Sequence, residues 1–131
     1  MTGPPSEPER PPRPPQVEFA AAILIVGGVT GIVGGFLGLF LGSTLPASAG
    51  LVPLVSIGLS VVTIAIGVLV HEGRLWRVCV NVIAIVMVLY LTALPNPLAV
   101  FYLLLDTLVI LLLLRQRAWF AWHPAPASMA T

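Results

Sequence analysis

Residues 18–42 are an almost uninterrupted apolar stretch, EFAAAILIVGGVTGIVGGFLGLFLG, that contains seven of the protein's twelve glycines. A stretch of this length can cross a membrane as a helix, since the hydrocarbon core of a bilayer requires about 20 apolar residues at about 1.5 Å each. Most of these glycines share one side of the predicted helix, so another helix can approach its backbone closely. The glycines of this strip are Gly27, Gly31, Gly34, Gly38 and Gly42, with Gly28 and Gly35 flanking it, and we expect Gly27, Gly31, Gly34 and Gly38 to make the contact.

Three further apolar stretches follow, at residues 51–70, 76–94 and 98–114. Only 8% of the residues are charged, against about 25% in soluble domains. These features predict an all-α membrane protein, a four-transmembrane-helix bundle formed by residues 17–122 with its first span at residues 18–42. That first span has the position of a signal peptide, but signal peptides have apolar cores of only about 7–15 residues, which favours a retained span.

The two ends of the chain differ from this domain. Residues 1–16 are rich in proline and contain no aliphatic side chain after the initiator methionine, so they can bury little apolar surface. We expect a disordered cytoplasmic tail, and the alternative is that its Pro-Pro-Arg-Pro-Pro segment binds an aromatic groove of another protein. Residues 123–131 are expected to form a short C-terminal tail.

The second span carries small residues along one helix face, at positions i, i+4, i+7 and i+11. Small residues at this spacing let membrane helices approach closely and exchange hydrogen bonds. We expect this face to pack against the glycine strip of the first span. Its members are Ser56, Ser60, Thr63 and Gly67.

All six positively charged residues are arginines, and none lies in the predicted loops 43–50 and 95–97. Four spans place every arginine on one side of the membrane, and the positive-inside rule then places both termini in the cytoplasm. We therefore expect a multi-pass protein of the cell (inner, cytoplasmic) membrane. The residues expected to anchor it at the lipid headgroups are Arg74, Trp76, Arg77, Arg115 and Arg117.

Asp106 is the only ionisable residue deep within a predicted span. A carboxylate at the centre of a bilayer costs about 2.5–3.5 kcal/mol, so Asp106 should face protein. Thr30 and Ser60 are predicted to lie at a similar depth and are its expected hydroxyl neighbours. Two interpretations stay open: a proton- or cation-binding site of a transporter, and a polar contact that holds helices together.

The sequence contains no pattern that indicates catalysis. It lacks a Ser-His-Asp order, paired carboxylates, a phosphate-binding loop and a metal-ligand cluster, so we expect no enzyme activity, no cofactor and no metal. The single cysteine, Cys79, is expected to be a packing residue, and the arginines are too dispersed for nucleic-acid binding. His71 and Glu72 form either a titrating pair or a hydrated span end.

Residues 73–114 resemble a family of small bacterial four-span membrane proteins of unknown function. The resemblance consists of Gly73-Arg74-Leu75-Trp76, the outer turn Pro95-Asn96-Pro97, and the core of the last span, Leu105-Asp106-Thr107-Leu108-Val109-Ile110. Arg77 lies one position earlier than the corresponding arginine of that family. The resemblance implies four spans and a characteristic aspartate at position 106, and it implies no known activity.

Packing motifs are abundant in this chain and polar motifs are scarce. We therefore predict a non-catalytic membrane subunit or scaffold that associates with itself or with a larger membrane partner. The alternative is a small proton-coupled transporter or channel that uses Asp106.

Overall fold

The computed structural model of the chain describes residues 3, 9–41, 51–92, 94 and 97–122. These residues form four long helices and one short helix, and no strand occurs among them. The helices are α1 (Pro15–Leu41), α2 (Leu51–Glu72), α3 (Trp76–Thr92), α4 (Pro97–Arg115) and α5 (Arg117–Phe120). The expected all-α membrane bundle is confirmed. The loop at residues 42–50, the Pro95-Asn96 part of the outer turn and the C-terminal tail lie outside the described residues.

Three of these helices, α1, α2 and α4, are long and apolar enough to cross a membrane. Helix α3 is also apolar, and its 17 residues place it at the short end of the range for a span. Large apolar side chains cover the outside of the bundle; Val26, Val52 and Leu104 are 63%, 70% and 66% exposed. A surface of this kind requires lipid rather than water. The chain is therefore a multi-pass membrane protein.

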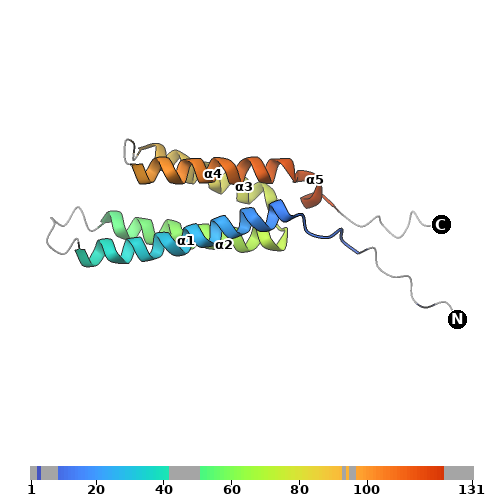
Figure 1. Cartoon of the computed structure of the whole chain (residues 1–131), viewed down its shortest axis with the longest axis horizontal. Helices are drawn as coiled ribbons and strands as arrows, with labels where there is room; N and C mark the ends of the chain where they lie inside the picture. Colours follow the sequence, from blue (N-terminus) through green and yellow to red (C-terminus); the bar gives the residue numbers. More distant parts are fainter. Residues whose placement is uncertain (1–2, 4–8, 42–50, 93, 95–96, 123–131) are drawn as a thin grey trace.

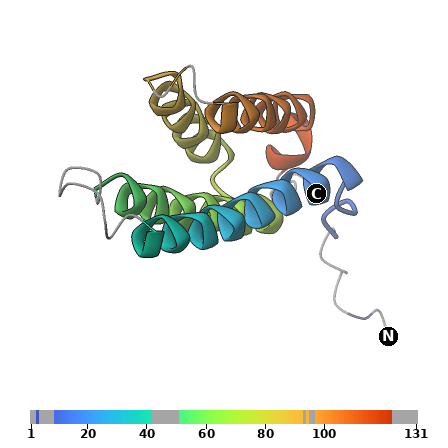
Figure 2. The same cartoon turned by 60° about the vertical axis from the view of Figure 1, so that its left-hand side comes forward.

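The four long helices form two antiparallel hairpins (Figure 1). Helices α1 and α2 are in contact along much of their length, and α3 pairs with α4. Within the second hairpin, the ring of Tyr90 on α3 stacks on that of Tyr102 on α4, with ring centres 5.4 Å apart. In the rotated view of Figure 2, the second hairpin is inclined to the first.

The buried core lies at the end of the bundle where α1 begins and α4 ends. It includes Val17, Leu24, Val70, Ile83 and Leu113, so every long helix contributes to it. The short helix α5 adds Trp119 and Phe120, which pack edge to face with ring centres 5.0 Å apart. The two hairpins are therefore joined mainly at this end.

The turn between the hairpins is a Schellman motif at the end of α2. The backbone N–H of Gly73 donates to the carbonyl of Val70 (3.0 Å), and the N–H of Arg74 donates to the carbonyl of Leu69 (2.9 Å). Gly73 has a φ of 70°, a left-handed conformation that glycine adopts without steric cost. This turn ends α2 at Glu72 and directs the chain into α3.

The N-terminal segment at residues 9–14 contacts the folded domain, whereas we predicted a disordered tail over residues 1–16. Arg10 donates from its guanidinium group to the carbonyl oxygens of Glu72 (3.3 Å) and Gly73 (3.2 Å). The indole N–H of Trp119 donates to the carbonyl of Pro11 (3.2 Å). These bonds use charged and backbone groups, so the absence of apolar side chains does not prevent the contact. Helix α1 then begins at Pro15, because proline fits the first position of a helix.

Candidate functional site

The contact between α1 and α2 is made through glycines. A Cβ atom on Gly28 would lie 2.8 Å from the carbonyl oxygen of Ser60, and one on Gly35 would lie 3.1 Å from that of Pro53. Both values are shorter than an ordinary contact, so only glycine lets the two backbones come this close. The bulkier residues of α2 that pack onto these glycines are Pro53, Ile57 and Ile64.

The prediction of the glycine strip is partly wrong. Gly31 and Gly38 face α2, where their added Cβ atoms would meet Ser60 and Pro53. Gly27 and Gly34 face away, and an added Cβ atom there would meet no other described residue within 4 Å. The contact face is therefore rotated toward Gly28 and Gly35, because this rotation leaves room for the isoleucines of α2 beside α1.

The small residues of α2 contact two different parts of the bundle, helix α1 and the junction with α3 and α4. Ser60 and Gly67 lie against α1, and a Cβ atom on Gly67 would lie 3.3 Å from the carbonyl oxygen of Ala21. Thr63 instead lines a pocket next to α3 and α4. Ser56 is half-buried, and its carbonyl accepts a hydrogen bond of 2.7 Å from the hydroxyl of Ser60. The predicted small-residue face of α2 therefore packs only in part against α1, and Thr63 lies instead where the two hairpins meet.

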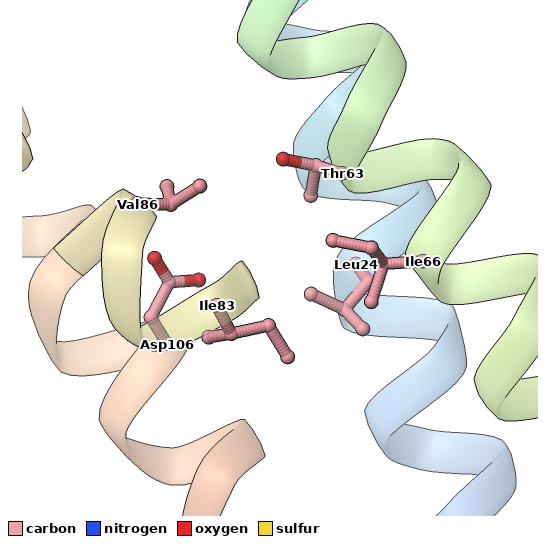
Figure 3. Close-up of a pocket in the computed structure, with 6 residues that line it drawn as sticks. All are labelled: Leu24, Thr63, Ile66, Ile83, Val86 and Asp106. Atoms are coloured by element: carbon pink, nitrogen blue, oxygen red, sulfur yellow. The ribbon is translucent and has the colours of Figure 1, made fainter. Parts of the chain in front are cut away.

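Asp106 lies on α4 at this junction and is 8% exposed. Its carboxyl group points into a pocket of about 10 Å³, enough space for about one water molecule (Figure 3). The hydroxyl of Thr63 points into the same pocket from α2. The remaining lining is apolar and consists of Leu24, Ile66, Ile83 and Val86. Oδ2 of Asp106 is buried and has no hydrogen-bond partner among the described residues.

The expected neighbours of Asp106 do not line this pocket. Thr30 is exposed, and its hydroxyl donates to the carbonyl of Val26 on its own helix (2.9 Å). Ser60 lies in the α1–α2 contact. Thr63 is the hydroxyl residue at the correct depth, since Thr63 and Asp106 each lie nine residues before the last residue of their helices, Glu72 and Arg115. Counting depth from these charged ends of α2 and α4 would have identified it.

The predicted interface residues gather where α2 ends, α3 begins and α4 ends. Trp76 donates from its indole N–H to the carbonyl of Leu113 (3.1 Å), which holds the start of α3 against the last turn of α4. Arg74 lies 3.9 Å from the carboxylate of Glu72. Arg77, Arg115 and Arg117 are exposed, and among the described residues their guanidinium groups have no ion pair or hydrogen bond.

The N-terminal segment adds two arginines that were not predicted as site residues. Nη1 of Arg13 lies 3.1 Å from Nε2 of His71 and 3.7 Å from the carboxylate of Glu18. Arg10 lies over the ring of Trp119. The sequence signal was the placement of both arginines just before α1. In an antiparallel hairpin the start of α1 lies beside the end of α2, so these arginines lie beside the α2–α3 turn.

Comparison of the chain with protein-family models, with curated proteins and with solved structures finds no match. The family resemblance of residues 73–114 therefore stays a prediction. Among the residues that the structure describes, no three His, Cys, Asp or Glu side chains gather in a group that could hold a metal ion.

Proposed function

We propose that this protein is a non-catalytic membrane subunit or scaffold that associates laterally with a second copy of itself or with a larger membrane partner. The observation that carries this proposal is a strip of small residues on the outer side of α1. It consists of Gly27, Thr30 and Gly34, and none of them packs against α2. Small residues on a lipid-facing surface allow another helix to approach closely, and such contacts drive association in membranes.

The outer strip is distinct from the internal contact. Helix α1 uses Gly28, Gly31, Gly35 and Gly38 to hold α2, so Gly27 and Gly34 are not needed for the fold of the hairpin. The hydroxyl of Thr30 donates its hydrogen bond to a carbonyl of its own helix, so this residue can face an apolar neighbour. The protein can therefore present this strip to a partner without rearranging its core.

We propose the bacterial cell (inner) membrane as its location, with both termini in the cytoplasm. The support is the placement of all six arginines at one end of the helices: before α1, from the α2–α3 turn to the first turn of α3, and from the last residue of α4 onward. The positive-inside rule assigns such segments to the cytoplasmic side.

Site-directed photo-cross-linking in native membranes tests the association. A photoreactive label attached to Thr30→Cys is expected to give one discrete product, at the mass of a dimer or of a complex with a larger protein. The native Cys79 is fully buried and should not take up the label. Addition of Gly34→Ile is expected to abolish the product, because its side chain occupies the outer strip.

Two controls make this experiment specific. A label at Val29→Cys, which is 49% exposed and lies about 100° around the helix axis from Thr30, should react with lipid. Gly58→Ile makes the same chemical change at an outward position of α2 and should leave the cross-link intact. A labelled Thr30→Cys that reacts only with lipid would contradict the proposal.

A second function, a small proton-coupled transporter or channel, is favoured by the environment of Asp106. Its Oδ2 atom is buried, faces a pocket and has no hydrogen-bond partner in the part of the chain that the structure describes. Ionisable groups within membranes often mark the path of a proton or an ion. Against this function, Thr63 is the one other polar residue that lines the pocket, so the described residues provide no continuous polar path.

Proton flux into liposomes separates the two functions. The subunit proposal predicts no flux above that of empty liposomes for the wild-type protein. Flux that is present in the wild type, lost in a folded Asp106→Asn variant and retained in Thr107→Val would establish transport instead. Thr107 is a suitable control because it is the exposed neighbour of Asp106 and its hydroxyl donates to the carbonyl of Leu103 within α4.

A further inference from the structure

A second, larger pocket of about 640 Å³ lies at the arginine-bearing end of the bundle. It is formed by the first turn of α3 and by α5, which are brought together because Trp76 is hydrogen-bonded to the end of α4. Gln116 separates α4 from α5 and lets the chain turn there. The residues that line the pocket are Trp76, Arg77, Arg117, Ala118, Phe120 and Ala121.

The pocket has a strong and unbalanced positive charge. Arg77 and Arg117 both line it, and neither guanidinium group has an ion pair or hydrogen bond among the described residues. Among the described residues no carboxylate lines the pocket, and Glu72 and Glu18 lie beside other arginines, Arg74 and Arg13. Two free guanidinium groups in one pocket match the oxygens of a phosphate, which arginine binds through paired N–H donors.

The surroundings of the pocket indicate that this phosphate belongs to a lipid. An exposed strip continues from Arg77 along α3 in steps of about one turn, through Asn81, Ala84 and Val88. A lipid whose phosphate lies at Arg77 would place its acyl chains along this strip. The aromatic rings of Trp76 and Phe120 also line the pocket, and tryptophan at this position is typical of the headgroup region of a membrane.

We propose that this pocket binds the headgroup phosphate of an anionic membrane phospholipid through Arg77 and Arg117. The proposal goes beyond lateral association, because it names a site and a ligand class away from the outer strip of α1. Basic pockets between membrane helices on the cytoplasmic side are known to bind anionic headgroups. The same chemistry would suit inorganic phosphate, and the experiment separates the two.

Native mass spectrometry of the purified full chain in a neutral detergent measures the bound ligand. The wild type is expected to retain phosphatidylglycerol in preference to phosphatidylcholine, and inorganic phosphate at the same concentration should not displace it. The double variant Arg77→Gln, Arg117→Gln is expected to bind phosphatidylglycerol about 25-fold more weakly, since each basic residue near an anionic surface contributes about fivefold.

The matched control is the double variant Arg74→Gln, Arg115→Gln. It removes the same charge from the same end of the bundle but changes no residue that lines the pocket. It should bind phosphatidylglycerol within about twofold of the wild type. Thermal unfolding of both double variants monitors the fold, which the exposed positions of all four arginines should preserve.

Three outcomes would overturn the proposal. The first is equal retention of phosphatidylglycerol and phosphatidylcholine by the wild type. The second is equal weakening in the two double variants, which would indicate attraction by overall charge rather than by the pocket. The third is displacement of the lipid by inorganic phosphate, which would assign the pocket to a soluble anion.

Discussion

The guanidinium carbon of Arg10 lies 4.0 Å from the centre of the Trp119 ring, although the two residues are near opposite ends of the chain. Arg10 also donates to the carbonyls of Glu72 and Gly73, and Trp119 donates to the carbonyl of Pro11. The N-terminal segment thereby connects the α2–α3 turn to α5. A Cβ atom on Gly73 would lie 2.5 Å from Arg10 and 2.7 Å from Trp119, so glycine is required at this position for the contact.

Arg10→Gln should destabilise the folded protein by about 1 kcal/mol. The variant loses the cation–π contact, and its shorter side chain does not make both carbonyl bonds. The measurement is unfolding in mild detergent followed by tryptophan fluorescence. Arg74→Gln removes an exposed ion pair of 3.9 Å and should change stability by less than about 0.5 kcal/mol. Equal stability of Arg10→Gln and the wild type would show that the contacts of Arg10 do not stabilise the fold.

Gly28→Ala and Gly27→Ala should differ although the residues are adjacent. The new methyl group at position 28 would lie 2.8 Å from the carbonyl oxygen of Ser60, so α1 and α2 must separate, at a cost of about 1–3 kcal/mol. The methyl group at position 27 meets no other described residue within 4 Å and should leave the stability of the hairpin unchanged. Unfolding by titration with a denaturing detergent measures both. Equal destabilisation would contradict the assigned contact face.

Trp76→Phe should destabilise the contact between α3 and α4 by about 1 kcal/mol, because it removes the indole donor to the carbonyl of Leu113 and keeps an aromatic ring. Trp122→Phe is the control, since no side-chain bond of Trp122 is found among the described residues. Thermal unfolding of the two variants in the same detergent compares them. A larger loss from Trp122→Phe would argue against this role of Trp76.

The number, class and approximate bounds of the four long helices could be predicted because apolar length alone determines them, whereas the short helix α5 was not predicted. The end of α2 at Glu72 was predictable to within two residues, since charged residues and Gly73 interrupt the apolar run there. The choice between Gly27 and Gly28 was not predictable. They lie on either side of Gly31 around the axis of α1, and the isoleucines of α2 determine which side is covered.

The candidate sites were predictable in part. Asp106 was recognised because a buried carboxylate in an apolar span is costly, but its neighbour Thr63 depends on how the two hairpins pack. Arg77 and Arg117 were recognised as interface residues one by one. Their shared pocket depends on the turn at Gln116, which helix patterns do not determine.

The most direct test of the membrane topology is cysteine labelling with a membrane-impermeant maleimide in intact cells. Ser48→Cys and Asn96→Cys are expected to react from outside, and Gln116→Cys is expected to react only after the membrane is permeabilised. The wild type is the blank, because Cys79 is fully buried. Reaction of Gln116→Cys in intact cells, with protection of Ser48→Cys and Asn96→Cys, would contradict the orientation. Labelling of all three positions from outside would contradict the four-span bundle itself.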